Sequence, residues 1–271
     1  MPRLPMSPQV FSIVSAIVRE RAGLHFDISH APIFAEKTAA RAAEAGFESL
    51  LDYYYFLRYD PAGTAETDCL IEALVVNETY LFRELPQLEV AVAGLSAILA
   101  AGRRPRIWCA ACATGEEPLT LAMLLADRGW LDQVDLVASD ISASVLARAR
   151  EGRLGRRALR GEIPSFAAPW LRVCEREVTV DARLRDAIDW RRVNLVDDSA
   201  FPTLGLFDLV FCRNVLIYFN DETARQVVDR LASTLRPDGI LFVGISESLL
   251  RLGTGLRCEE ENGVFCYRKA P

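Results

Sequence analysis

The chain has 271 residues, of which 51% are hydrophobic and 25% charged, with 16 glycines and 13 prolines. These proportions are typical of globular proteins and exclude a fibrous or disordered chain. The length fits one large domain or two smaller ones. The formal net charge of −6 argues against a surface built throughout for nucleic acid, because phosphate binding favours a basic field. We therefore expect no nucleic-acid partner.

One region departs from the acidic balance. Residues 148–192 contain twelve arginines, no lysine and seven acidic residues, a net charge of +5, which leaves about −11 on the remainder. The pattern is compatible with a solvated surface of dispersed ion pairs. It is equally compatible with a docking surface for an acidic partner.

The seven cysteines lie mostly within apolar runs and are expected to be small buried hydrophobes. Cys109 and Cys112 form a CxxC pair, but there is no second pair, and His25 and His30 are the only histidines that could complete a zinc site. We therefore expect no metal.

The longest uncharged stretch, residues 90–102, is shorter than the roughly 20 apolar residues of a membrane span. Near the amino terminus, Val10, Val14, Ile17 and Val18 follow helical spacing with serines between them, unlike a cleavable signal. These features predict a cytoplasmic protein without membrane insertion.

The first hundred residues predict helices only, without a strand pattern. The expected helices cover residues 8–22, 33–45, 47–59, 66–75 and 87–101, separated by Gly46, Gly63 and Pro86 among others. From residue 105 onward, short β-branched or apolar runs alternate with helical patterns, which is typical of parallel βαβ units. We expect a helical domain at 1–86, a linker helix at 87–104 and an α/β domain at 105–271.

The α/β domain is expected to hold seven strands and three helices. The strands are predicted at 106–111, 135–139, 188–193, 208–212, 240–243, 256–259 and 264–268, and the helices at 116–127, 143–151 and 222–235. The long interval of about 152–187 exceeds an ordinary connection and predicts a small inserted β-subdomain. Within it, residues 171–174 and 177–180 alternate like a short β-ribbon.

In a doubly wound sheet, ligands bind at the carboxyl ends of the strands. The turn after the first strand has one glycine, Gly115, and two carboxylates, Glu116 and Glu117, in the first helical turn. Thr114 and Glu117 have capping-box spacing, so a purely structural role is open. Two negative charges would repel a pyrophosphate, so a ligand here would be a nucleoside with a cationic substituent.

Polar residues follow the next three strands. Asp140 lies twenty-five residues after Gly115, where a ribose-binding acid falls in nucleoside-binding units, although an aspartate here could instead cap a helix. Asn194 follows the third strand, and Arg213 and Asn214 follow the fourth. They could be turn formers, but Arg213 and Asn214 interrupt an apolar run and would need polar partners.

Four segments together resemble the chemotaxis receptor glutamate O-methyltransferase family, CheR. They are residues 77–84 (NETYLFRE), 108–118 (WCAACATGEEP), 138–141 (ASDI) and 207–219 (FDLVFCRNVLIYF). Their order and spacing extend the resemblance over about residues 10–268. It implies an all-helical N-terminal domain, a Rossmann-like S-adenosylmethionine-dependent methyltransferase domain of the α/β class, and an inserted β-subdomain.

The resemblance also implies site residues. The donor S-adenosylmethionine would be held, and its product S-adenosylhomocysteine released, at positions matching Asn77, Thr79, Arg83, Glu117, Asp140, Asn194, Leu195, Asn214 and Val215. Arg83 and Tyr218 match the family's arginine and tyrosine close to the transferred methyl group. The implied reaction is methylation of glutamate carboxylates in the cytoplasmic helical domain of a chemoreceptor, for adaptation in chemosensory signalling.

Two departures from the family pattern concern the partner. The second helix offers only Lys37 and Arg41 where the family is rich in basic residues for docking the receptor. Residues 173–178 lack the glycines of the loop that grips a receptor's C-terminal tether in some members, which argues against docking of a tether pentapeptide. A methyltransferase for another acceptor, and a regulator that binds the donor without turnover, remain alternatives.

Overall fold

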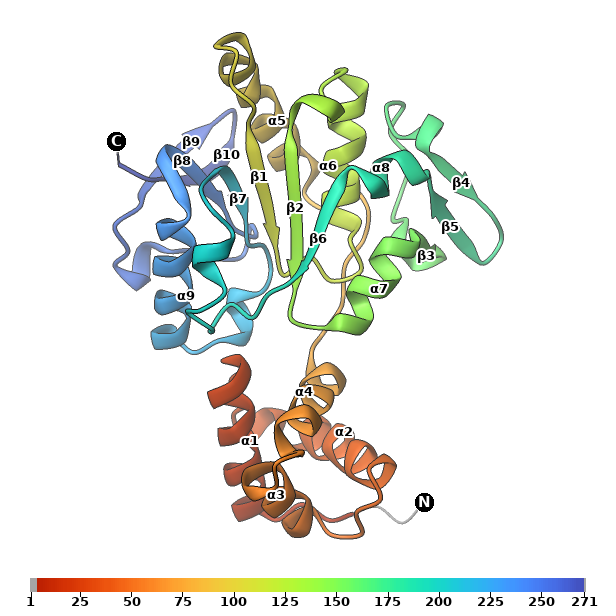
Figure 1. Ribbon diagram of the computed structural model, residues 1–271, viewed down its shortest axis with the longest axis vertical. Helices are drawn as coiled ribbons and strands as arrows, with labels where there is room; N and C mark the ends of the chain where they lie inside the picture. Colours follow the sequence, from red (N-terminus) through yellow and green to blue (C-terminus); the bar gives the residue numbers. More distant parts are fainter. Residues whose placement is uncertain (1–3, 271) are drawn as a thin grey trace. The chain divides into compact units, whose positions relative to one another are not determined.

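The computed structural model describes residues 4–270, which form two compact units (Figure 1). The first comprises the chain up to Val76 together with Ile217–Thr223, and the second comprises Asn77–Leu216 with the chain from Ala224 onward. The domain limits expected at residues 86 and 104 stay predictions. Within residues 4–270, no helix combines the length and the apolar character that crossing a bilayer requires.

The first unit is built from helices, as the sequence predicts. They are α1 (Pro8–Ala22), α2 (Ala31–Glu44), α3 (Leu50–Tyr59) and α4 (Gly63–Leu74), with the short 3-10 helix η1 (Ile28–His30) before α2. Helix α1 begins where the Ser7 side chain accepts a hydrogen bond from the Val10 amide, and it ends at Gly23 in the left-handed conformation, φ 74°. Phe34, Tyr53 and Leu70 lie fully buried between the helices.

The carboxylate of Glu66, on α4, is hydrogen-bonded to side chains of α2 and α3. Arg41 of α2 donates to its two oxygens at 2.7 and 2.8 Å, and the Tyr53 hydroxyl of α3 donates at 2.7 Å. Burial alone would raise the pKa of Glu66, but the hydrogen bonds from Arg41 and Tyr53 outweigh it, so the pKa lies below its ordinary value. The charged form of Glu66 therefore stabilises the folded unit.

The change Glu66→Gln should lower the free energy of unfolding by about 2 kcal/mol at pH 7, because it removes charge-assisted hydrogen bonds. The folded-state pKa is lowered, so this stability is fully present above the ordinary glutamate pKa of about 4.3 and declines as the pH falls below it. Urea denaturation at pH 7 and pH 3.5 should show the difference between the two proteins shrinking in acid. A difference that is independent of pH would contradict the assignment.

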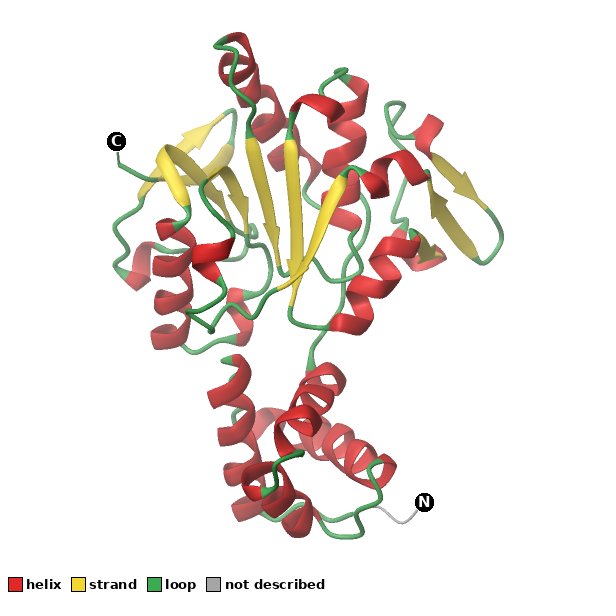
Figure 2. Cartoon of the chain, in the orientation of Figure 1, coloured by secondary structure: helices red, strands yellow, loops and turns green. Residues whose placement is uncertain are grey.

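The second unit is organised around a seven-stranded sheet, drawn in yellow in Figure 2. Its strands are β1 (Arg106–Ala110), β2 (Asp135–Asp140), β6 (Ile188–Arg192), β7 (Phe207–Phe211), β8 (Leu235–Phe242), β9 (Arg257–Glu261) and β10 (Val264–Arg268). The order across the sheet is β6-β2-β1-β7-β8-β10-β9, and β10 runs opposite to the other six strands. All seven predicted strands are confirmed, and so is the α/β fold class.

Helices cover this sheet. They are α5 (Leu85–Ala100), α6 (Glu116–Asp127), α7 (Ala143–Glu151), the short α8 (Ala182–Asp186) and α9 (Asp221–Ser233), whose first residues belong to the helical unit. Leu88 of α5, Leu119 of α6 and Leu146 of α7 share one buried cluster with Ile107 and Leu136 of the strands. This continuous core fixes the turns at the strand ends.

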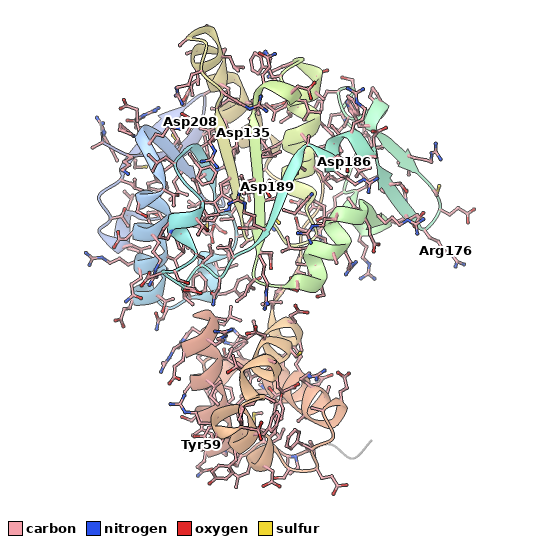
Figure 3. All side chains as sticks on the ribbon, viewed as in Figure 1. Tyr59, Asp135, Arg176, Asp186, Asp189 and Asp208 are labelled. Atoms are coloured by element: carbon pink, nitrogen blue, oxygen red, sulfur yellow. The ribbon has the colours of Figure 1, made fainter. Side chains whose placement is uncertain are left out.

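The long interval after α7 forms a separate three-stranded sheet. Strands β3 (Arg153–Gly155) and β4 (Leu171–Val173) both pair antiparallel with β5 (Glu177–Val180), so the predicted β-ribbon is confirmed. Val178 and Val180 point inward, and Arg176 lies in the turn between β4 and β5, at the tip of the insert in Figure 3. The insert begins directly after a Gly152 helix cap with φ 62°.

Candidate functional site

Polar residues converge at the carboxyl ends of four neighbouring strands. The order β6-β2-β1-β7 brings the turns after these strands side by side, and they carry Asn194, Asp140, residues 111–115 and Asn214 respectively. The strand arrows in Figure 2 end at this common edge. The sheet therefore assembles into one place the residues that the sequence separates by a hundred positions.

The turn after β1 is tightly wound. Ala111, Ala113 and Gly115 all have positive φ, at 56°, 47° and 91°. A side chain at Gly115 would place its Cβ 2.8 Å from the ring of Trp190, so the turn needs a glycine for both space and conformation. The capping-box interpretation is wrong, because Gly115 is the N-cap of α6 and the Thr114 hydroxyl bonds instead to the Glu116 carboxylate at 2.7 and 2.9 Å.

Asp140 is buried, and its carboxylate links two neighbouring turns. Its Oδ2 accepts a hydrogen bond from the Ala113 amide at 2.9 Å, and its Oδ1 accepts from the Ser142 amide at 3.0 Å. Helix α7 is capped by Ser142, whose hydroxyl oxygen accepts from the Val145 amide. Asp140 is therefore not the cap of that helix, and it holds the β1 turn against the end of β2.

The turn after β6 lies beside Asp140. The Val193 amide donates to the Asp140 carbonyl at 3.0 Å, and the Asn194 side chain accepts from the Val196 amide at 3.2 Å, which forms a local turn. Leu195 is buried. The backbone thus keeps Asn194 and Leu195 next to the end of β2.

Arg213, which follows β7, has a buried side chain that is 2% exposed. Its guanidinium donates to Glu117 of α6 at 2.8 Å, to Glu84 at 2.9 Å and to the backbone carbonyl of Arg83 at 2.8 Å. Glu84 also accepts from the Ile245 amide at 3.3 Å. One arginine thereby joins three segments that are distant in sequence.

Burial and charge act against each other in this cluster. Burial raises the pKa of Glu117, and the Arg213 guanidinium offsets the rise only in part. Burial would lower the pKa of Arg213, but Glu117 and Glu84 outweigh it, so the pKa is raised and the arginine stays charged. Burial also raises the pKa of the Cys109 and Cys112 thiols, which keeps both as neutral, unreactive groups.

The segment 77–84 crosses the amino-terminal side of α6 and carries Arg83. It is held by backbone contacts: the Leu81 amide donates to the Ala158 carbonyl at 2.8 Å, and the Phe82 amide donates to the Thr120 hydroxyl at 3.2 Å. The Arg83 side chain is 28% exposed, donates to the Glu78 carbonyl at 3.3 Å and lies 5.6 Å from the Tyr80 ring centre. Its Nε also lies 4.0 Å from Glu84 Oε1, so these contacts hold the half-buried guanidinium in place.

The other residues that are predicted to contact the methyl donor are more exposed to solvent. Asn77 is exposed, and Thr79, Asn214 and Val215 are half-buried. Tyr218, the second predicted catalytic residue, lies in the 3-10 helix η6 (Leu216–Tyr218), and its carbonyl accepts from the His25 amide at 2.8 Å. Tyr218 belongs to the helical unit, whereas Arg83 belongs to the sheet unit.

The two predicted docking residues already have partners within the helical unit. Lys37 donates to the Leu74 carbonyl at the end of α4 at 3.3 Å, and Arg41 binds Glu66 and Glu44. Sequence reasoning could not find Leu74 and Glu66 as partners, because they lie 37 and 25 residues away on another helix. Docking through Lys37 and Arg41 stays a prediction.

Sequence reasoning missed Glu247, which lies in the loop after β8. Its carboxylate accepts hydrogen bonds from the backbone amides of Asn214, Leu216 and Gly244, at 2.7, 2.8 and 2.7 Å. The residue is 9% exposed. The only signal in the sequence is an acidic residue closely following an apolar strand, which is too common to identify a role.

The family comparison agrees with this geometry. A family model described as "CheR methyltransferase, SAM binding domain" matches residues 77–262, which contain six of the seven strands of the large sheet, the insert and the turns after β1, β2, β6 and β7. Among residues 4–270, no group of three or more His, Cys, Asp and Glu side chains is arranged to hold a metal ion.

The chain is also similar in sequence to several named methyltransferases. It is 36% identical over 245 residues to the "Probable biofilm formation methyltransferase WspC" of Pseudomonas putida, a match that covers 89% of this chain and 57% of that protein. It is 32% identical over 244 residues to "Chemotaxis protein methyltransferase 2" of Vibrio cholerae, covering 87% and 84%. It is 35% identical to "Chemotaxis protein methyltransferase 1" of Pseudomonas aeruginosa, covering 77% and 79%.

The fold and the match define a Rossmann-like, S-adenosylmethionine-dependent methyltransferase domain. The chain belongs to the CheR methyltransferase family. It spans a little over half the length of the two WspC relatives that it matches.

The change Arg213→Met should lower the free energy of unfolding by about 3–5 kcal/mol, because it leaves Glu84 and Glu117 buried without their cation. Arg58→Met is the matched control, since Arg58 forms an exposed ion pair with Glu20, and it should leave the free energy of unfolding nearly unchanged. Urea denaturation of the two variants measures both values. Equal losses would contradict the buried role of Arg213.

Proposed function

We propose that this protein transfers a methyl group from S-adenosylmethionine to glutamate side-chain carboxylates of a chemoreceptor. The observation that carries the proposal is the convergence of Glu117, Asp140, Asn194 and Asn214 at one sheet edge, beside the segment that presents Arg83. Their order along the chain is that of the family motifs, within the residues matched by the family model.

The chemistry of the site suits this donor. Asp140 accepts hydrogen bonds from the Ala113 and Ser142 amides, and a carboxylate oxygen can accept more than one hydrogen bond, as from a ribose hydroxyl. Glu84 and Glu117 pair with the Arg213 guanidinium, and Glu84 Oε1 also lies 4.0 Å from Arg83 Nε. The carboxylates of Asp140 and Glu117 at the strand ends disfavour a phosphate and suit a ligand with an amino group and a sulfonium.

The reaction needs no general base from the protein. A glutamate carboxylate with a pKa of about 4.3 is ionised near pH 7 and is itself the nucleophile. The donor, when bound, supplies an electrophilic methyl group. The protein's contribution is alignment, which can supply ~7–11 kcal/mol. Arg83 would orient the acceptor carboxylate, and Tyr218 would hold the methyl group or the acceptor in place by a hydrogen bond. A tight ground-state ion pair at Arg83 would slow the reaction, because charge is neutralised in the transition state.

The partner is proposed from the names of the relatives. Those from Vibrio cholerae and Pseudomonas aeruginosa are named chemotaxis protein methyltransferases, and two others are named WspC, for biofilm formation. We propose that the substrate is the cytoplasmic helical domain of a receptor, in a chemosensory pathway that controls either chemotaxis or biofilm formation. Lys37 and Arg41 would dock it only by competing with their present partners Leu74 and Glu66.

Isothermal titration with S-adenosylhomocysteine should show saturable 1:1 binding, which Asp140→Ala should abolish because the ribose loses its acceptor. Asp189→Ala is the matched control, since Asp189 is an exposed aspartate of β6 paired with Arg191 (Figure 3). It should bind normally. Binding that survives in Asp140→Ala at the parental affinity would overturn the proposed donor site.

Incubation with labelled S-adenosylmethionine and a receptor helical fragment should give a product that mild base hydrolyses, as a carboxyl ester must. Arg83→Ala should reduce kcat by about 100-fold, on the order seen when one transition-state contact is removed. Arg225→Ala, an exposed arginine of α9, is the control and should leave the rate unchanged.

A base-stable methyl product would instead favour an acceptor other than a carboxylate. Transfer by Arg83→Ala at the parental rate would contradict the role of Arg83.

A further inference from the structure

The turn after β7 is shaped by one carboxylate from the loop after β8. Glu247 Oε2 accepts from the amides of Asn214 and Gly244, both at 2.7 Å, and Oε1 accepts from the amide of Leu216 at 2.8 Å. All four residues belong to the sheet unit. Three backbone donors that would otherwise need water are thereby satisfied by a single side chain.

This clamp holds Asn214 in an unusual conformation. Asn214 has a φ of 59°, in the left-handed region, which asparagine tolerates better than most residues but does not prefer. Gly244 leaves room for the asparagine amide, since a Cβ there would lie 2.4 Å from Nδ2 of Asn214. The Glu247 hydrogen bonds offset the backbone cost and hold the backbone from which the Asn214 side chain projects.

We propose that Glu247 is a positioning residue for the methyl donor: it acts through Asn214, which it holds at the carboxyl edge of the sheet, and does not touch the methyl donor itself. The inference rests on the proposed function, because it is this turn that the proposal assigns to donor binding. A carboxylate suits the task because it accepts several N–H bonds at once and donates none.

Asp208 provides a matched control from β7, the strand that precedes Asn214. It is also a buried carboxylate, 5% exposed, that accepts a backbone hydrogen bond, from the Arg106 amide at 2.9 Å, and it pairs with Arg103 at 2.6 Å. It lies at the opposite, amino-terminal edge of the sheet (Figure 3). Loss of Asp208 should therefore lower the stability of the protein without changing the turn after β7 that carries Asn214.

The experiment is calorimetric titration of Glu247→Gln and Asp208→Asn with S-adenosylhomocysteine. Glutamine turns an NH₂ group toward a backbone amide, so the turn must rearrange. We expect the Kd to rise at least tenfold in Glu247→Gln with the stoichiometry still near one, and to stay within twofold in Asp208→Asn although its Tm falls. A merely structural role would instead lower the stoichiometry, through loss of folded protein, and leave the Kd unchanged. That result overturns the inference.

Coupling to Asn214 is the second readout. In an Asn214→Ala background, Glu247→Gln should change the Kd less than twofold, because the side chain that it orients is gone. Gly244→Ala reaches the same turn from its other side and should weaken binding by a similar factor, so the test does not depend on one variant folding. Unchanged affinity in Gly244→Ala, or full additivity with Asn214→Ala, overturns the inference.

Failure of the proposed function gives a different result. If the unsubstituted chain fails to bind S-adenosylhomocysteine, the proposed function and this inference fall together. If it binds and Glu247→Gln binds equally well, only the role of Glu247 is wrong.

Discussion

The buried ion cluster around Arg213 is the constraint on which the site depends. A guanidinium at 2% exposure must have its charge compensated, and Glu84 and Glu117 do so from two different segments. Because the same guanidinium also donates to the Arg83 carbonyl, the segment that carries Arg83 cannot move without breaking a buried charge pair. The position of Arg83 is thus set by electrostatics at the end of β7.

Backbone strain gathers at the same edge. Among the described residues, seven other than glycine have positive φ, and five of them surround the site: Phe82, Glu84, Ala111, Ala113 and Asn214. Such conformations cost energy and persist where neighbouring contacts hold them. Here the holding contacts come from Thr120, Arg213, Asp140 and Glu247. A preorganised edge of this kind suits a reaction whose catalysis is alignment.

The sequence predicts the frame of the molecule well, because that frame follows from local periodicity. The seven strands, the main helices and the β-ribbon at 171–180 occur where alternation and helical spacing place them. It also predicts that Asp140, Asn194 and Asn214 gather at one edge, since parallel strands end together. Turn chemistry was less predictable: Thr114 and Glu117 have the spacing of a capping box, yet they bind Glu116 and Arg213.

Partners distant in sequence were not predictable at all. Nothing local indicates that Glu247 would accept from Asn214, or that Arg41 would be bound by Glu66. The most direct measurement of the account is a crystal structure with S-adenosylhomocysteine. We expect its ribose at Asp140, its amino-acid end near Glu117 and its sulfur directed toward Arg83. A nucleoside bound away from the carboxyl ends of β1, β2 and β6 would contradict the account.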